Sequence, residues 1–344
     1  MTALLPQLLA EAGLEATPRS ADPALWTRTA AALPYLPVAY SAAMIDYQLA
    51  YFRGAGQAIE DASLILHHDH RPCGLWPLSF VTGTPGRIGS NGGAVLPPLF
   101  AAALAEKSQK KLGAACVELA AAAAAALGNG DWETLCPFAN RLGLDHWHEA
   151  ALRRRAQSAV AHELLVDLTL DIAAIKSRIR KSYKALITSG EKLWQVDVLA
   201  DGDAAAWAEF QALHLQVAGR ATRSEESWQA QRNAIDGGDA FLVRLRDAAG
   251  VLVGGGFFHV TRDEGLYAVA AYDRSLFDKP LGHVVQFRAI EELKRRGARW
   301  YRIGARPYAA DLPAPSEKEL AIAEFKEGFA THLLPLFRLT VPAA

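Results

Sequence analysis

The stretch EGLYAVAAYDRSLFDKPLGHVVQFRAIEELKRRG, residues 264–297, decides the fold. Its apolar beginning predicts a strand over Gly265–Ala271, and the apolar stripe further on predicts a helix from Gly282 to the stop signal Gly297. The loop Tyr272–His283 joins them. Because the first turn of a helix leaves main-chain N–H groups without partners, this loop predicts a pocket for a phosphate or for a carbonyl oxygen that gains negative charge.

Further strands are predicted on both sides of this stretch. One is expected at Trp300–Gly304, and a strand–turn–strand unit is expected at Ala240–Arg246 and Val251–Val260. The first half repeats the order of two strands, glycine-containing loop and helix, at Asp61–His68, Gly74–Val81, Ser90–Gly93 and Ala101–Leu127. A chain of 344 residues is too long for one ordinary core, since domains average ~150 residues. We therefore expect two similar α/β domains, residues 1–160 and 161–344.

Helix start signals are clear between these units. Asp171 is expected to cap a helix that runs to Gly190, and Asp203 to cap one that ends at Gly219. Thr222-Arg223-Ser224-Glu225 has capping-box spacing, which predicts that Thr222 begins the next helix.

The second half resembles a known family. The motifs that carry the resemblance are Arg274, Pro280-Leu281, Gln286–Ile290, Gly297, Tyr301–Gly304 and Phe325–Phe329, in this order. They look like the second domain of the FemAB-like N-acyltransferases, which belong to the GNAT superfamily, and the match spans Asp167 to the end. The first half matches in outline. The resemblance implies two tandem GNAT-like domains, each a mixed, mainly antiparallel sheet flanked by helices.

Composition limits the functions to consider. Lys and Arg number 36 against 37 Asp and Glu, so no overall field attracts nucleic acid or an anionic membrane. Cys73, Cys116 and Cys136 form no CxxC pair, which suggests thiols of a reducing compartment. The N-terminal residues do not form a signal peptide, and the alanine-rich run Leu112–Leu127 is too short to span a bilayer. We expect a cytoplasmic protein without a membrane span.

Acyl transfer to an amine requires a docked donor, an oxyanion stabiliser, a route for the amine proton and exclusion of water. The resemblance implies that Lys326 stabilises the oxyanion, helped by the main-chain amide of Phe325. An ammonium in a dry site is well suited to this role. The alternative is a surface lysine on an amphipathic element. Asp273, Glu317 and Glu319 are candidates to accept the amine proton, as is a neutral His283, and Asp273 ranks above both glutamates.

Two groups of residues are candidates for holding the donor or the acceptor. In the loop, Arg274, Lys279, Gly282 and His283 would bind phosphate or a terminal ribose. The alternative is that Asp273 pairs with Arg274 and Pro280 only starts the helix. The other candidates are basic residues that could anchor phosphate, or else belong to solvated helix faces: Arg180, Lys184, Arg220 and Arg223.

The first half offers two further clusters. His67, His68 and His70 lie at a turn and make no metal site that the pattern supports, because His67 is expected on the opposite face and no fourth ligand is evident. Asn91-Gly92-Gly93, after Arg87, is the plausible ligand loop of this half. Acceptor binding is expected at the cleft between the halves, by analogy with the family.

The resemblance thus implies an N-acyltransferase whose acceptor is an amine of an amino sugar, a peptide or a precursor of the cell envelope or of a surface polysaccharide. Its co-substrate is aminoacyl-tRNA or acyl-CoA. The loop has only Gly282 where a GNAT pyrophosphate loop has more glycines, which favours the tRNA. No permanently bound cofactor or metal is expected. The alternatives are an acetyltransferase of the acyl-CoA-dependent GNAT type, acting on a small amine or a nucleotide sugar, and a binding protein without turnover.

Overall fold

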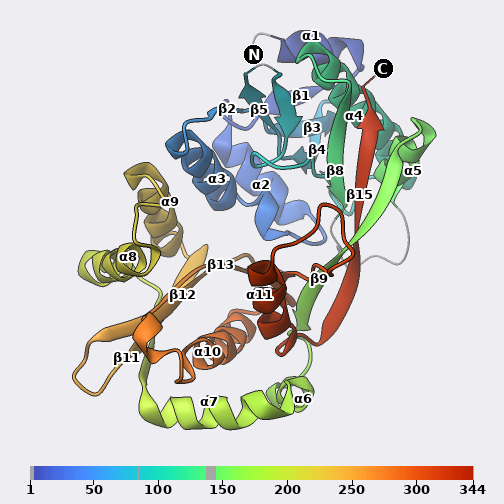
Figure 1. Ribbon diagram of the computed structural model, residues 1–344. Helices are drawn as coiled ribbons and strands as arrows, with labels where there is room; N and C mark the ends of the chain where they lie inside the picture. Colours follow the sequence, from blue (N-terminus) through green and yellow to red (C-terminus); the bar gives the residue numbers. More distant parts are fainter. Residues whose placement is uncertain (1–3, 84, 137–144, 344) are drawn as a thin grey trace. The chain divides into compact units, whose positions relative to one another are not determined.

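The computed structural model describes residues 4–83, 85–136 and 145–343, which form two compact units (Figure 1). The first unit contains Met1–Val160 and Leu336–Ala344, and the second contains Ala161–Pro335. The sequence predicts domains of residues 1–160 and 161–344, whereas residues 336–344 group here with the first unit. The reason is that the last strand, β15 (His332–Pro342), pairs antiparallel with β8 (Asp131–Cys136).

The first unit contains two small sheets, in the orders β1-β3-β4-β7 and β2-β5-β6. Its strands are β1 (Ala16–Pro18), β2 (Ala58–Asp61), β3 (Leu64–His68), β4 (Arg71–Trp76), β5 (Ser79–Thr82), β6 (Arg87–Gly89) and β7 (Leu99–Phe100), besides β8. Its helices are α1 (Leu5–Glu11), α2 (Pro23–Ala32), the 3-10 turn η1 (Val38–Tyr40), α3 (Ala42–Gly54), α4 (Glu106–Ala126) and α5 (His146–Arg153).

Strand β3 shows how the core of the first unit is built. Leu64 and Leu66 pack in the cluster that contains residues of α1, α4 and α5, whereas Ile65 packs in the cluster that contains residues of α2 and α3. Successive side chains of a strand point to opposite faces, so helices cover both faces here. None of the helices in the described ranges is long and apolar enough to cross a bilayer, the alanine-rich α4 included.

The second unit is one mixed sheet with helices on both faces. The strand order is β10-β11-β12-β13-β14-β9. The strands are β9 (Gln157–Asp167), β10 (Gln195–Leu199), β11 (Ala240–Arg246), β12 (Leu252–Val260), β13 (Glu264–Tyr272) and β14 (Trp300–Ala305). The helices are α6 (Ile172–Arg178), α7 (Lys181–Leu193), α8 (Ala204–Ala218), α9 (Glu225–Asp236), the 3-10 turn η2 (Arg274–Leu276), α10 (Leu281–Arg295) and α11 (Glu317–Glu327).

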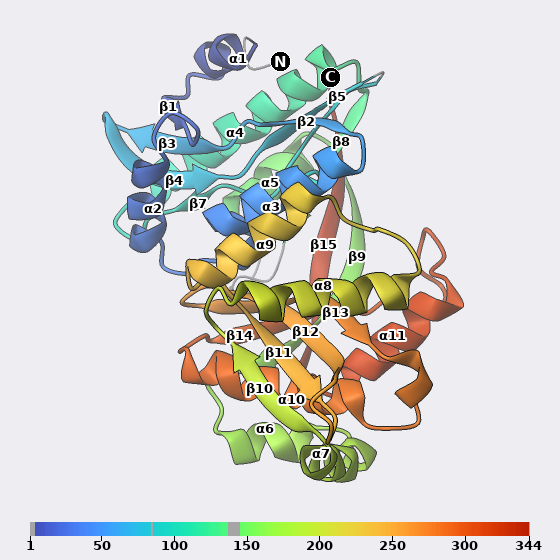
Figure 2. The same cartoon turned by 90° about the vertical axis from the view of Figure 1, so that its left-hand side faces the viewer.

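Within this unit α8 and α9 lie on one side of the sheet, and α10 with α7 lies on the other (Figure 1, Figure 2). Two glycines of β12 mark how closely the helices approach. A Cβ atom at Gly255 would meet Phe210 of α8 at 3.2 Å, and one at Gly256 would meet Val285 of α10 at 2.7 Å. The glycines therefore allow tight packing on both faces of the sheet.

Several predicted elements are confirmed, and others are wrong in detail. The predicted strands Asp61–His68 and Gly74–Val81 are each interrupted, and the helix predicted from Ala101 begins at Glu106. Asp171 and Asp203 cap α6 and α8 as expected. The helix predicted from Asp171 to Gly190 is two helices, because Arg180 takes an extended conformation and its N–H donates to the carbonyl oxygen of Gly328 at 2.8 Å. Helix α9 is capped by Ser224, whose hydroxyl accepts from the Ser227 N–H, and not by Thr222.

Candidate functional site

A cavity of about 830 Å³ lies in the second unit, beside β13 and the start of α10. Its walls come from β13, the loop after it, the start of α10, helix α11 and the end of α8. The lining residues are mainly apolar or aromatic, with cations among them: Val217, Tyr267, Ala270, Tyr272, Arg274, Phe277, Lys279, Leu281, Gly282, His283, Lys318, Ala321, Ile322, Phe325 and Lys326. The cavity thus gathers Lys326 and the four candidate residues of the loop.

A bulge in β13 brings two tyrosines to this cavity. Tyr267 pairs with Phe258 of β12, but Val269 pairs with Phe257, so Ala268 is an extra residue. Tyr267 and Tyr272 are five positions apart and would face opposite sides of a regular strand. Because the bulge reverses the alternation, both line the cavity, and their hydroxyls are 3.5 Å apart.

Strands β13 and β14 separate next to the cavity. They pair in parallel at three positions, ending at Leu266 and Arg302, although both strands continue. Beyond this point β14 reaches Gly304, whose φ is 144°. A Cβ atom at Gly304 would lie only 2.8 Å from the Lys326 ammonium, so the glycine leaves the space that this side chain occupies.

Lys326 is a partly buried cation on α11. Its Nζ lies 5.4 Å from the centre of the Tyr267 ring, within the range of a cation–π interaction. Burial lowers the pKa of Lys326 below its ordinary value of 10.5, and no charged neighbour in the described part of the chain contributes to this shift. An ammonium without a carboxylate partner is available to a negative charge on a ligand.

The start of α10 adds main-chain donors to the cavity. Pro280 precedes the helix and provides no side-chain cap, and the Leu281 N–H donates to Lys279. The N–H groups of Gly282 and His283 belong to the first turn, where no intrahelical acceptor exists. A Cβ atom at Gly282 would meet the Phe325 ring at 3.0 Å, so glycine also permits α10 and α11 to approach here.

His283 lies among aromatic rings at the same helix start. Its ring centre is 4.6 Å from that of Tyr183 and 5.2 Å from that of Phe325, both in edge contact. Burial lowers the pKa of His283 below 6.5. The imidazole is therefore neutral at pH 7 and able to accept a proton.

Asp273, the first sequence candidate for the proton acceptor, has another task. Its Oδ1 accepts hydrogen bonds from the Ser275 N–H at 2.9 Å and from the Ser275 hydroxyl at 2.8 Å, and so caps η2. It does not line the cavity. Arg274 and Lys279 do line it, and Lys279 is paired with Asp278 at 2.9 Å. Geometry favours His283 over Asp273 as the group that faces a ligand.

Phe325 lines the cavity through its ring, which packs against Phe329 at 5.4 Å between centres. Its main-chain amide lies in the last turn of α11, where each N–H donates to the carbonyl four residues earlier. The expectation that this amide helps bind an oxyanion is therefore wrong. Glu317 and Glu319 form the first turn of α11, and Glu319 completes a capping box with Ser316.

The basic residues expected to act together as a phosphate anchor are separated. Arg220 and Arg223 line a different cavity of about 270 Å³ between α8 and α9, where Arg223 donates to His214 at 3.0 Å. Lys184 donates to the main-chain oxygen of Ser177 at 2.8 Å, and Arg180 to that of Glu324 at 3.2 Å. The two pairs do not share one site, which corrects the prediction.

A polar group next to Lys326 is not evident from the sequence. Tyr301 donates to the side-chain oxygen of Gln286 at 2.5 Å, and Tyr267 is also hydrogen-bonded to Gln286. Burial raises the pKa values of Tyr267, Tyr272 and Tyr301, so all three keep their hydroxyl protons at neutral pH. The alternation of side chains along β13 does not predict that Tyr267 and Tyr272 lie together, because the bulge is visible only in the pairing of β13 with β12.

The histidine cluster of the first unit resolves into separate contacts. His67 lies 3.0 Å from the Thr17 hydroxyl, His70 3.0 Å from Glu15, and His68 3.2 Å from Asp69. Across residues 4–83, 85–136 and 145–343, no three His, Cys, Asp or Glu side chains are gathered in a way that could hold a metal ion.

Replacing Gly304 by alanine tests how Lys326 is positioned. The new methyl group would collide with the ammonium and would sit on a backbone of φ 144° that side chains rarely adopt. We expect the Gly304→Ala variant to bind a ligand whose negative charge lies at the Lys326 ammonium, such as an analogue of a carbonyl oxyanion, at least ~10-fold more weakly, as expected when one charge-assisted contact is lost. Calorimetric titration measures this, with Gly250→Ala, also at positive φ but in an open turn, as the control.

No family model and no curated protein matches the sequence. Solved structures match at low identity. FemX has a TM-score of 0.66 at 10% identity, over 91% of this chain and 95% of that chain. L-PGS from Bacillus licheniformis has a TM-score of 0.52 at 14% identity, and the match covers 79% of this chain and 82% of that chain. A tandem GNAT protein from the clavulanic acid biosynthesis pathway has a TM-score of 0.50 at 16% identity, and the match covers 96% of this chain and 99% of that chain.

The chain has the FemX-like fold of two tandem GNAT-like domains. This confirms the predicted fold class, and at the level of the fold it confirms the resemblance to FemAB-like acyltransferases of the GNAT superfamily. Identities this low extend to the fold alone. The activity has to be inferred from the cavity at Lys326.

Proposed function

We propose that this protein is an N-acyltransferase that uses the cavity at Lys326 to transfer an acyl or aminoacyl group to an amine. One observation carries the proposal: an ammonium without an ion-pair partner in the described ranges lies in an apolar cavity, at the point where β13 and β14 separate. Such a charge stabilises a developing oxyanion far better than it would in water. The likeness to acyltransferase folds supports this reading.

In the proposed reaction the acceptor nitrogen attacks the carbonyl carbon of the donor. The electron pair of the carbonyl bond moves to oxygen, where the Lys326 ammonium and the Gly282 N–H offset its charge. Neutral His283 accepts the proton of the amine. The intermediate then collapses to the amide and expels the thiolate or the ribose alkoxide of the donor, which takes up the proton held by His283.

Two donors are compatible with this chemistry. The separated strands β13 and β14 offer unpaired main-chain groups to an extended arm, which favours an acyl-CoA. The loop before α10 has one glycine close to the helix start, which favours an aminoacyl-tRNA, held by Arg274 and Lys279. For the acceptor we propose an amine of a peptide or amino sugar of an envelope precursor, in keeping with the likeness to FemX.

Thermal unfolding with each donor distinguishes them. A ligand at 100 times its Kd adds about 2.7 kcal/mol to the free energy of unfolding, which raises Tm by several degrees. We expect a rise with acyl-CoA or with aminoacyl-tRNA, and a smaller rise in the Arg274→Ala/Lys279→Ala variant. The donor that stabilises the protein is then tested for transfer to amines. Stabilisation without transfer to any amine would favour the binding-protein alternative.

The pH dependence of transfer follows from the pKa of Lys326. Burial lowers this pKa, and only the protonated side chain can stabilise the oxyanion, so kcat is expected to fall as pH rises, with a midpoint below 10.5. Stopped assays with donor hydrolysis subtracted measure the profile. In Lys326→Arg the falling limb should disappear, because a guanidinium stays protonated. If kcat of this variant still falls at the same pH, the titrating group is not Lys326.

A further inference from the structure

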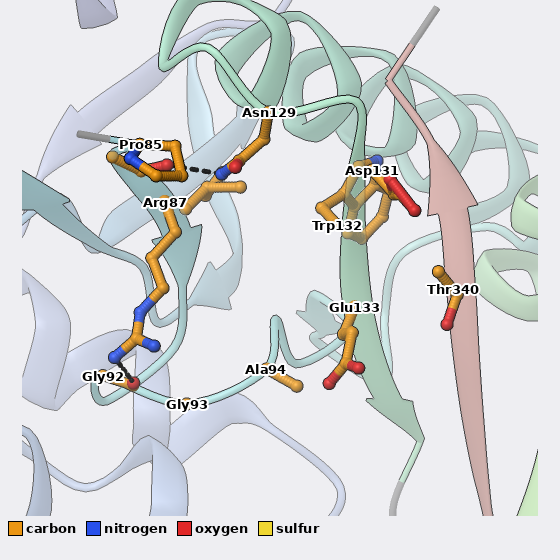
Figure 3. Close-up of a pocket in the computed structure, with 12 residues that line it drawn as sticks. Pro85, Arg87, Gly92, Gly93, Ala94, Asn129, Asp131, Trp132, Glu133 and Thr340 are labelled. Atoms are coloured by element: carbon orange, nitrogen blue, oxygen red, sulfur yellow. Dashed lines mark hydrogen bonds between the residues drawn. The ribbon is translucent and has the colours of Figure 1, made fainter. Parts of the chain in front are cut away.

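The first unit contains a cavity that the proposed reaction does not use. It has a volume of about 600 Å³ and lies between β6 and β8 (Figure 3). The loop Asn91-Gly92-Gly93 lies beside it, and Gly92 and Gly93 line it. Ligand sites commonly have volumes of about 300–1,000 Å³, so this cavity is large enough for a small molecule or a short peptide.

Hydrogen bonds connect the two sides of this cavity at both of its ends. At one end the Gly86 N–H donates to Leu127 at 3.2 Å, and the Asn129 side chain donates back to the Gly86 oxygen. At the other end the Val95 N–H donates to the Glu133 oxygen at 2.8 Å. Between these ends β6 and β8 are both terminal strands in their sheets, and they do not pair with each other.

The main chains of the two strands direct polar groups into the gap. Gly86 uses its N–H and C=O on this side, and alternation directs those of Ile88, two residues later, the same way. On β8 the Glu133 oxygen points to this side, so the groups of Asp131 do as well. Two strand edges thus face each other, an arrangement that an extended peptide main chain can satisfy.

The side chains on the exposed face have opposite charges on the two strands. Arg87 extends from β6, held by the Gly92 oxygen at 3.1 Å, and Asp131 and Glu133 extend from β8 (Figure 3). Neither carboxylate has an ion-pair partner among the residues that the structure describes. Behind them Trp132, which is 4% exposed and also lines the cavity, has an indole N–H without a partner in the described ranges.

We propose that this cavity binds the amino-terminal end of a short peptide in extended conformation, against the edges of β6 and β8 that face it. The ligand ammonium would contact Asp131 and Glu133. A carbonyl or carboxylate further along would accept from Arg87, and the peptide groups between would pair with the strand edges. One cation against two anions gives the site a net negative charge, which favours a ligand with a free amine.

Calorimetric titration of the full chain with trialanine tests this proposal. We expect binding that weakens about tenfold or more when the peptide is N-acetylated, because the charge-assisted hydrogen bonds of the ammonium are lost. This comparison uses the unaltered protein and does not depend on a variant folding. Equal affinities for both peptides, or no binding of trialanine at millimolar concentration, would overturn the proposal. Pantetheine binding in place of trialanine would also overturn it, in favour of a neutral amide ligand.

Variants locate the binding. Glu133→Gln and Asp131→Asn together should weaken trialanine about tenfold or more, and Arg87→Gln should weaken trialanine more than its C-terminal amide. Glu106→Gln, an exposed carboxylate of α4 that does not line the cavity, is the matched control and should change nothing. Lys326→Ala should retain full binding. If Lys326→Ala loses trialanine and Glu133→Gln keeps it, the peptide binds at the cavity of the second unit and the proposal fails.

Discussion

The Lys326→Ala variant is expected to lose acyl transfer by about 10²–10³-fold in kcat, while its affinity for the donor changes little. This is the range observed when one oxyanion donor is removed, about 2.7–4 kcal/mol of transition-state stabilisation. Donor affinity should be kept because the negative charge on the carbonyl oxygen exists only in the transition state. Single-turnover rates and donor titration, measured on the same preparation, separate the two quantities.

Lys318 provides the matched control for this experiment. It lies on α11 and lines the same cavity, but its side chain is exposed. Charges in contact with water contribute little, so Lys318→Ala should lower kcat by less than about fivefold. Equal losses in both variants would show that the cavity attracts its ligand by overall charge. A Lys326→Ala variant with unchanged kcat would exclude Lys326 as the oxyanion stabiliser.

The Arg302→Met variant is expected to lose about 3–5 kcal/mol of the free energy of unfolding. Arg302 on β14 is bonded to Glu163 of β9 and contacts Glu264 of β13 at 3.4 Å, and the two glutamates are 5% and 2% exposed. Removing the guanidinium leaves two buried carboxylates without their cation, which is far more costly than losing a surface pair. Urea unfolding measured at constant pH gives the difference.

Two comparisons identify the cause of this loss. Arg244→Met removes an ion pair with Asp197, whose side chain is 43% exposed. This variant should lose no more than about 1 kcal/mol of the free energy of unfolding. Adding Glu163→Gln and Glu264→Gln to Arg302→Met should restore part of the stability, because neutral amides replace the buried charges. A loss with Arg302→Met as small as that with Arg244→Met would mean that water reaches the two carboxylates.

The local elements of the second unit were largely predictable. Strands β11, β12 and β14 lie within one residue of their predicted bounds, and α8 begins after Asp203 and ends before Gly219 as expected. These signals are local: apolar periodicity gives the element, and a capping side chain or a left-handed glycine gives its end. The helix break at Arg180 was not predicted, because the Arg180 N–H donates to the carbonyl oxygen of Gly328, which is far along the chain.

The candidate site was predictable in part, because local motifs are visible in the sequence and contacts between distant segments are not. The loop before α10 and Lys326 could be named from the sequence motifs, and they line one cavity. The tyrosine group could not be named, because a single extra residue in β13 redirects Tyr267 and Tyr272. Asp273 has the chemistry of a proton acceptor, but its carboxylate is occupied as a cap.

The sequence by itself determined the elements, their ends and the types of residue that can carry an acyl transfer, since these depend on neighbours within a few positions. Only the tertiary structure decided which of these residues meet. It placed Lys326 beside Gly304, separated Arg220 and Arg223 from the cavity at Lys326, and returned residues 336–344 to the first unit. Such contacts depend on strand pairing and helix packing between distant segments, which no local pattern encodes.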